Sequence, residues 1–285
     1  MHWQTSRHLI ELSEPKVMGI VNVTPDSFSD GGRFASTRSA LAHCEKLLAE
    51  GAHILDIGGE SSRPGTPPVA AKEELDRVLP VLRDALTMGV PVSVDTCKPE
   101  VMREALDYGA DIINDISALR QPGALERIAG HPSCGICLMH MHGEPQIMQS
   151  SPMEGDAVPQ VLALLARVSQ DLRDRGVAAA RIAWDPGIGF GKRVEQNFAL
   201  LARQHELLAS GYPLVVGWSR KSSLGTVTGL SVHDRTAPSV AAALLAVERG
   251  AHIVRVHDVK ETVAALKVRG AMLAVANNRG MERNA

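Results

Sequence analysis

The sequence predicts an α/β fold, a (β/α)8 TIM barrel in which eight parallel strands alternate with helices. Three observations indicate it: short apolar segments typical of buried strands, amphipathic segments between them, and a helix-ending glycine that recurs before the strands. The chain has 285 residues, and a barrel of this kind takes about 250. A doubly wound open sheet would give a similar pattern and is the alternative.

One local theme occurs repeatedly along the chain. Its copies are Gly51–Asp56, Gly109–Asn114 and Gly250–Arg255, and each follows an amphipathic segment. Glycine supplies the left-handed residue that ends many helices, and the apolar run after it is typical of a strand buried on both faces. Each copy therefore predicts the end of a helix and the start of a parallel strand.

Extending this pattern gives the full set of candidate strands. They are Val17–Asn22, Ile54–Gly59, Val92–Asp95, Asp111–Asp115, Ile136–His140, Arg181–Asp185, Leu214–Gly217 and Ile253–His257. The longest helical stretches between them are Ala157–Arg175 and Ala237–Arg249. Because no proline-rich or low-complexity linker divides the chain, we predict one domain over residues 1–285. Residues 1–16 would form a short N-terminal extension, expected to be a hairpin that closes the bottom of the barrel.

Net charge, apolar runs and cysteine content exclude several classes of protein. The net charge of −2 gives no reason to expect nucleic acid or an anionic membrane as a partner. The longest apolar runs, such as Ser239–Val247, are too short to span a bilayer, and the N-terminus lacks the apolar core of a signal peptide. Four cysteines in a chain of this size do not suggest a disulfide framework. We therefore expect a cytoplasmic protein that acts on small molecules.

Polar residues appear where the predicted strands end. These residues are Asn22, Asp95, Asn114, Asp185, the run Ser219–Ser222, Arg255 and His257. Any one of them could be a strand-end cap. Together they would converge on the carboxyl end of the barrel, where barrel enzymes place their active sites, so we predict an active site there.

The residue types divide into two kinds of recognition. Asp95, Asn114 and Asp185 offer acceptors that suit a flat, nitrogen-rich heterocycle. The second set consists of donors that suit phosphate groups: Arg63, Lys221, Arg255 and His257. We expect a ligand with an aminated ring at one end and phosphates at the other.

Several segments resemble the signatures of dihydropteroate synthases. Met18–Gly32 is similar to the first signature of that family and Gly58–Gly65 to the second. Further matches, in family order, are Val94–Thr96, Ile113–Ile116, Asp185–Lys192, Ser219–Ser222 and Arg255–Asp258. The resemblance covers nearly the whole chain, and the first signature is specific by itself.

The resemblance implies a transferase reaction of folate biosynthesis. The family condenses 6-hydroxymethyl-7,8-dihydropterin diphosphate with p-aminobenzoate, with Mg²⁺ as cofactor, and releases pyrophosphate. The implied mechanism is a dissociative substitution at the pterin methylene, which depends on stabilising the charge of the leaving group. The family also implies a homodimer and a target for sulfonamides, which mimic p-aminobenzoate.

The same resemblance assigns roles to residues. The pterin would contact Asp95, Asn114, Asp185 and Lys221. The diphosphate and its metal would meet Asn22 as metal ligand, with Arg63, Arg255 and His257. The p-aminobenzoate would lie against Phe190, Pro64 and the stem of Lys221, with its carboxylate at Ser222.

Two loops complete this expected site. As in related enzymes, the loop from Thr24 to Gly32, with Phe28 and Asp30, would fold over it together with the loop that carries Arg63. Asp30 would stabilise the cationic intermediate or take the amine proton. Ser62 stands where many relatives carry threonine, which removes one methyl contact near p-aminobenzoate. We interpret the glycines of the segment Gly187–Gly191 as room for the substrates to approach the backbone.

Two other functions stay open at this point. A methyltetrahydrofolate:corrinoid methyltransferase would share the acceptor residues but would need no diphosphate site, so Arg255 and His257 argue against it. A pterin-binding homologue without turnover would keep the same residues and can be separated only by an assay.

Overall fold

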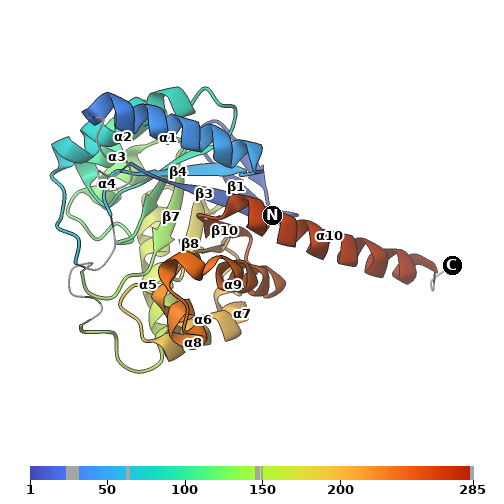
Figure 1. Ribbon diagram of the computed structural model, residues 1–285. Helices are drawn as coiled ribbons and strands as arrows, with labels where there is room; N and C mark the ends of the chain where they lie inside the picture. The colour runs from blue at the N-terminus through green and yellow to red at the C-terminus, as the bar shows by residue number, and fades with distance from the viewer. Residues whose placement is uncertain (24–31, 62–64, 145–147, 149, 283–285) are drawn as a thin grey trace.

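The computed structural model describes residues 1–23, 32–61, 65–144, 148 and 150–282. Eight parallel strands form its main sheet (Figure 1). They are β3 (Lys16–Asn22), β4 (Ile54–Gly58), β5 (Val92–Asp95), β6 (Ile112–Asp115), β7 (Gly135–Met139), β8 (Ile182–Asp185), β9 (Val215–Val216) and β10 (Ile253–Val256). Every predicted strand end lies within one residue of these bounds. Strand β9 is shorter than expected because only Val215 and Val216 pair continuously with β10.

The sheet closes on itself. Its hydrogen-bonded order is β8-β7-β6-β5-β4-β3-β10-β9, and a parallel bridge between Trp184 and Leu214 joins its two ends. At this seam the amide of Trp184 donates to the carbonyl oxygen of Pro213 at 2.8 Å. The closed sheet confirms the predicted barrel and excludes the doubly wound alternative.

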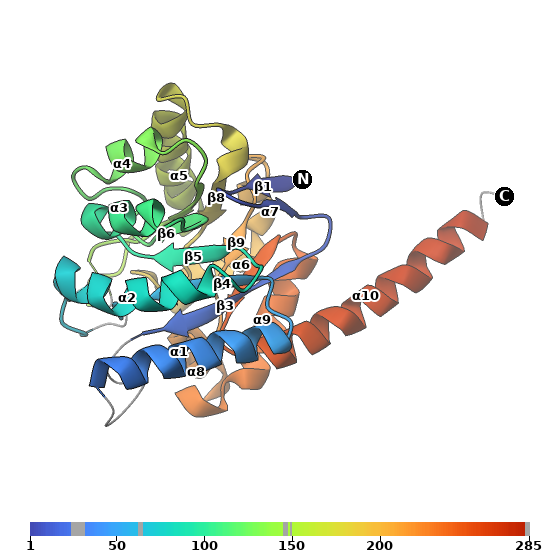
Figure 2. The same cartoon turned by 90° about the horizontal axis from the view of Figure 1, so that it is seen from above.

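Helices surround the barrel (Figure 2). They are α1 (Gly32–Ala49), α2 (Ala71–Ala85), α3 (Pro99–Asp107), α4 (Ala124–Gly130), α5 (Ala157–Asp174), α6 (Val194–Ala202), α7 (Gln204–Leu208), α8 (Ser222–Thr228), α9 (Thr236–Glu248) and α10 (Val259–Glu282), with 3-10 turns η2 (Ala179–Arg181) and η3 (Val232–Asp234). Gly51, Gly109 and Gly250 all have positive φ at helix ends, as the repeated theme predicts.

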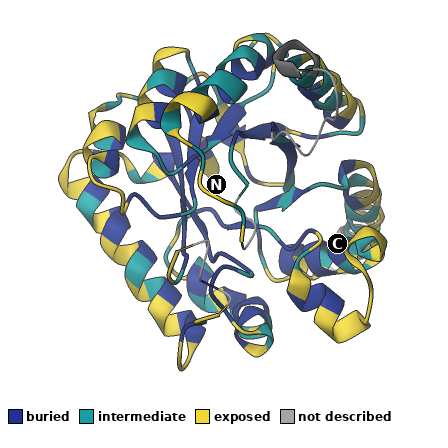
Figure 3. Cartoon of the chain, turned by 60° about the vertical axis from the view of Figure 1, so that its left-hand side comes forward, coloured by how far each residue is buried: buried dark blue, intermediate teal, exposed yellow. Residues whose placement is uncertain are grey.

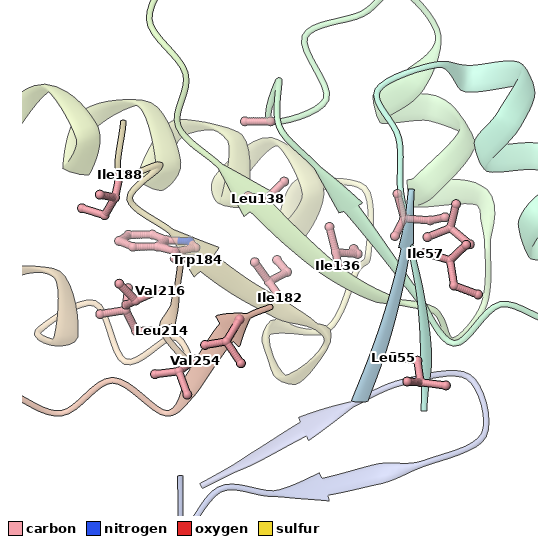
Figure 4. Close-up of a cluster of buried hydrophobic side chains, with 14 of the residues drawn as sticks. Leu55, Ile57, Ile136, Leu138, Ile182, Trp184, Ile188, Leu214, Val216 and Val254 are labelled. Atoms are coloured by element: carbon pink, nitrogen blue, oxygen red, sulfur yellow. The ribbon is translucent and has the colours of Figure 1, made fainter. Parts of the chain in front are cut away.

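The outward faces of the strands form the larger core. Side chains alternate along a strand, so residues such as Leu55, Ile136 and Trp184 point toward the helices (Figure 4). The indole Nε1 of Trp184 donates to Ser169 Oγ on α5 at 2.8 Å, which satisfies its one polar atom. Figure 3 shows the result: the strands are buried and exposed residues lie on the outer faces of the helices.

The N-terminal segment is a hairpin that plugs the bottom of the barrel. Strands β1 (His2–Gln4) and β2 (Leu9–Glu11) pair antiparallel. Trp3, Ile10 and Leu12 are buried with the inward residues at the start of the barrel strands, which are Met18, Ile54, Ile112, Cys137, Ala183, Val215 and Ile253. The indole of Trp3 donates to the carbonyl oxygen of Arg181 at 2.9 Å. The expected hairpin is confirmed, and it makes the floor beneath the site apolar.

The last helix extends beyond the barrel. Figures 1 and 2 both show the C-terminal part of α10 projecting away from the rest of the molecule. A helix of this length spans about 36 Å. Within the part of the chain that the structure describes, no helix is both long enough and apolar enough to cross a membrane.

Candidate active site

The polar residues predicted at the strand ends converge inside the upper barrel. Asp95 ends β5, Asn114 lies in β6, Asp185 ends β8, and Arg255 lies in β10. Their chain neighbours Val94, Ile113, Trp184 and Val254 belong to the outer core. Because side chains alternate, the four polar side chains point to the barrel axis, above the apolar floor closed by the hairpin.

Arg255 is the centre of this polar group. Its Nε donates to Asp56 Oδ2 at 2.6 Å, and its Nη2 donates to Asp95 Oδ2 at 2.6 Å. Asp56 is completely buried, whereas the side chains of Arg255 and Asp95 keep about a fifth of their surface exposed (21% and 18%). The guanidinium thus lies between two carboxylates, one below it and one at the mouth.

Asp56 is a site residue that the sequence analysis missed. It lies in the middle of β4, and its Oδ2 also accepts a hydrogen bond from Asn114 Nδ2 at 3.2 Å. A charged residue inside an otherwise apolar, fully buried strand is the signal that would have found it, since an unpaired buried charge is very costly.

Two buried acceptor atoms in this group have no partner among the described residues. They are Asp56 Oδ1 and Asn114 Oδ1. Buried polar atoms are nearly always hydrogen-bonded, so atoms of this kind at the open end of a barrel point to a ligand that brings its own N–H groups. An aminated heterocycle supplies them.

Burial shifts the pKa values of the site carboxylates. Burial, reinforced by the like charges of Asp56 and Glu74, raises the pKa of Asp95 to about 7, although Arg255 opposes the rise. Burial also raises the pKa of Asp185, while the Gly187 N–H and Lys221 oppose it. The Gly187 amide donates to Asp185 Oδ1 at 2.7 Å, which leaves Oδ2 of that carboxylate for other partners.

Lys221 lies between the acceptor group and an aromatic ring. Its ammonium stands 4.1 Å from the ring centroid of Phe190, a cation–π distance. Burial, and repulsion by Arg255, lower the pKa of Lys221 to about 8, while Asp185 and Asp95 oppose the fall. Phe190 packs with Met139, Met141 and Met148 in a small apolar cluster. Lys221 can therefore contact a ring on the acceptor side and a second ring on the Phe190 side.

Lys192 is a second residue that the sequence analysis did not assign. Its buried ammonium donates to the carbonyl oxygens of Gly187 at 2.8 Å, His140 at 3.2 Å and Phe190 at 3.2 Å. Burial lowers its pKa to about 7, and Asp185 opposes the fall. Lys192 thus joins the loop after β8 to the end of β7 and holds the backbone that carries Phe190.

The interpretation of the glycines in this loop is wrong for Gly187 and Gly191. Both have positive φ, and a Cβ on either would lie against backbone of the β7 end: 1.8 Å from the carbonyl oxygen of His140 for Gly187, and 2.2 Å from that of His142 for Gly191. These glycines are needed because protein backbone, and not substrate, occupies the adjacent space.

His257 lies just after β10 and is held by the turn after β9. Its backbone N–H donates to Ser219 Oγ at 3.1 Å, and its ring Nδ1 lies 3.0 Å from the same oxygen. Arg220, which has φ of 59°, directs its guanidinium outward to Asp258, with the shorter contact at 2.6 Å. Hydrogen bonds therefore join the segments that follow β9 and β10, which carry the predicted phosphate-binding residues Lys221 and His257.

The structure describes only some of the predicted site residues. Asn22 ends β3 and is half-buried, and Ser222 is exposed at the start of α8. Five predicted residues lie outside the described residues: Phe28, Asp30, Ser62, Arg63 and Pro64. Arg255, predicted on the phosphate side, donates directly to Asp95, predicted on the heterocycle side.

Comparison with known proteins gives a consistent result. Residues 18–257 match the model of the family described as pterin binding enzyme. A dihydropteroate synthase of Neisseria meningitidis serogroup B is 51% identical over 272 residues, which cover 93% of this chain and 95% of that protein.

The chain is also similar to solved structures of dihydropteroate synthases. A Burkholderia cenocepacia dihydropteroate synthase complexed with 7,8-dihydropteroate has a TM-score of 0.87 and 48% identity, covering 97% of this chain and 98% of that one. A Xanthomonas albilineans dihydropteroate synthase with 4-aminobenzoic acid has a TM-score of 0.87 and 47% identity, covering 93% and 96%.

Proposed function

The chain belongs to the dihydropteroate synthases, within the pterin-binding enzyme family, and from this membership we propose how its barrel mouth carries out their transferase reaction. The amine of p-aminobenzoate replaces pyrophosphate on the methylene carbon of 6-hydroxymethyl-7,8-dihydropterin diphosphate, which yields 7,8-dihydropteroate. The observation that carries the assignment of residues is the group formed by Asp56, Asn114, Asp95 and Arg255, with its two unpaired buried acceptors.

The pterin occupies the deep end of the mouth. Its amino group and ring N–H groups donate to Asn114 Oδ1 and the Asp185 carboxylate, and Asp56 Oδ1 is a further acceptor beneath the ring. Lys221 donates to the ring from the Phe190 side. Buried carboxylates at this position have a second effect, because they stabilise positive charge on the pterin more strongly than water would.

The diphosphate lies toward His257, Arg255 and Arg63. These residues donate hydrogen bonds to the phosphate oxygens as negative charge develops on the leaving group. Stabilising that charge is the main requirement of a dissociative substitution, and it explains why no strong base is needed beside the amine.

Asn22 fits a site for the proposed Mg²⁺. Mg²⁺ prefers oxygen ligands and, when it accompanies a phosphate substrate, takes only one or two of them from protein. The half-buried amide at the end of β3 offers one such oxygen at the mouth. When bound there, Mg²⁺ would neutralise part of the diphosphate charge.

The p-aminobenzoate lies above the pterin methylene. Its ring packs on Phe190, Pro64 and the stem of Lys221, and its carboxylate accepts from the Ser222 hydroxyl. The bond from the methylene to the diphosphate oxygen breaks first, with both electrons leaving on pyrophosphate, and the amine lone pair then forms the new C–N bond to the cationic methylene. The amine then loses a proton, which Asp30 accepts in this proposal.

The proposed assembly is a homodimer formed through α10. Val268, Met272 and Val275 are more than half exposed, and their spacing places them on one face of the helix. Leu245 of α9 is also exposed, and α9 packs beside α10. A second copy of the chain would cover this apolar face.

The proposed setting is the cytoplasm. All four cysteines are described and are free thiols, which agrees with a reducing compartment.

One assay tests the proposed function. We expect pyrophosphate release from the pterin diphosphate that depends on both p-aminobenzoate and Mg²⁺, with 7,8-dihydropteroate as co-product. Tight binding of the pterin without release of pyrophosphate would instead support the binding-protein alternative. No observation favours the corrinoid methyltransferase.

A further inference from the structure

The contact between Ser219 and His257 is more specific than an ordinary packing contact. Two nitrogens of His257, the backbone N and the ring Nδ1, lie 3.1 Å and 3.0 Å from one oxygen, Ser219 Oγ. A serine hydroxyl has one hydrogen to donate and two lone pairs that accept. Because the backbone nitrogen can only donate, it must use one of the lone pairs.

The remaining hydrogen bond can be made in two ways. Either the ring donates an Nδ1–H to the second lone pair, or the hydroxyl donates its hydrogen to a bare Nδ1. In the first case the Ser219 O–H has no acceptor, since Nδ1 is its one potential acceptor among the residues that the structure describes. Ser219 is buried, and a buried hydroxyl without a partner is disfavoured. The second arrangement satisfies every group.

A hydrogen bond from the Ser219 hydroxyl to Nδ1 also determines which ring nitrogen of His257 carries the proton. A neutral ring carries one proton, so a ring whose Nδ1 accepts must carry its hydrogen on Nε2. The ring is held neutral, because burial and the charges of Arg255 and Arg220 lower the pKa of His257 to about 3. Within the described part of the chain Nε2 has no hydrogen-bond partner, and the half-buried ring lies at the mouth.

We propose that Ser219 is a positioning residue that holds His257 in the tautomer protonated at Nε2, so that this N–H donates to an oxygen of the diphosphate leaving group. The identity of the acceptor rests on the proposed function; the tautomer itself does not. Without Ser219 the ring could present a bare Nε2, which would repel an anionic oxygen instead of binding it.

The tautomer can be measured directly. In protein labelled with ¹⁵N at the histidine rings, the His257→Gln variant identifies the resonances of His257. We expect a protonated Nε2 and an unprotonated, hydrogen-bonded Nδ1 in the unliganded wild-type protein. A proton on Nδ1 would overturn the proposal, whatever reaction the protein catalyses.

Variants then test whether Ser219 is the cause. In Ser219→Ala we expect Nδ1 to lose its donor and both ring nitrogens to shift toward values averaged over two tautomers, with Ser219→Thr restoring the wild-type positions. Ser239→Ala is the matched control, because Ser239 is an equally buried serine whose hydroxyl accepts from the neighbouring Arg220 N–H at 2.8 Å and does not contact His257. Unchanged His257 resonances in Ser219→Ala would contradict the proposal.

Steady-state kinetics test whether the His257 tautomer affects binding of the pterin diphosphate. Loss of a hydrogen bond to a charged group predicts that Ser219→Ala raises the KM for the pterin diphosphate about tenfold, with the KM for p-aminobenzoate unchanged. In a His257→Gln background the same substitution should have almost no further effect, because Ser219 acts through the ring. Additive losses would show that Ser219 acts independently and would overturn its positioning role. If the wild-type protein releases no pyrophosphate, the proposed function fails while the tautomer result stands.

Discussion

Arg255 and Asp95 form an ion pair at the mouth of the barrel, with Nη2 of the guanidinium 2.6 Å from Oδ2 of the carboxylate. The pair joins a residue proposed to contact the leaving group to one proposed to contact the pterin. Asp56 holds the other side of the same guanidinium at 2.6 Å. The residues proposed for the pterin and for the diphosphate are therefore linked electrostatically, so a substitution at one of them should affect the binding of both parts of the substrate.

Replacing Asp56 should damage catalysis, because this residue holds Arg255 and is also proposed to accept from the pterin. Asp56→Asn removes one of the two charges that hold Arg255, and breaking a buried ion pair costs about 3–5 kcal/mol. We expect kcat/KM for the pterin diphosphate to fall by about 100-fold or more, as measured by pyrophosphate release. Ser93→Ala is the control, because Ser93 neighbours Asp56 in register on β5 and its buried Oγ has no described partner. Equal losses in both variants would argue against a specific role for Asp56.

Pterin binding should weaken at alkaline pH. The pKa of Lys221 is lowered to about 8, so the folded protein loses this positive charge as the pH rises through about 8, and the charge is fully present well below that pH. If the ammonium donates to the pterin, affinity measured by titration calorimetry should decline over this range. Lys221→Arg keeps its charge, so the decline in pterin affinity of this variant should move to higher pH. Since titration of the pterin ring affects both proteins alike, identical profiles would exclude Lys221 as the cause.

Gly187 should be intolerant of a side chain because of the β7 carbonyl. In Gly187→Ala the new Cβ would lie 1.8 Å from the carbonyl oxygen of His140, and the alanine would also have to adopt a positive φ. Gly211→Ala is the matched control: Gly211 has φ of +79° and nothing within 4 Å of a Cβ. We expect thermal denaturation to show a loss of about 1 kcal/mol for Gly211→Ala and clearly more for Gly187→Ala. Similar losses would mean that the loop yields and that the close approach is not required.

The barrel was predictable because its signals are local. Glycine-ended helices followed by buried apolar runs give the strands, and polar residues at their ends give Asp95, Asn114 and Asp185. Asp56 was missed because one carboxylate within an apolar run does not interrupt the strand pattern. The ion pair of Arg255 with Asp95 joins residues 160 positions apart, and nothing in the spacing indicates how far each side chain reaches across the barrel. The same holds for Lys192, which donates to the carbonyl oxygen of His140 at the end of β7 as well as to two carbonyl oxygens of its own loop.

The apolar face of α10 should mediate self-association. The side chains of Val268, Met272 and Val275 have exposed fractions of 73%, 56% and 55%, which is unusual for three apolar residues on one helix face unless a partner covers them. The double variant Val268→Glu/Met272→Glu would place charges on this face, and burying unpaired charges is costly. We expect light scattering to find a dimer for the wild type and a monomer for the double variant, with similar thermal stability of the barrel. Lys267→Glu makes an equivalent charge change at an exposed neighbouring position and should leave the dimer intact. A double variant that stays dimeric would place the interface elsewhere on the molecule.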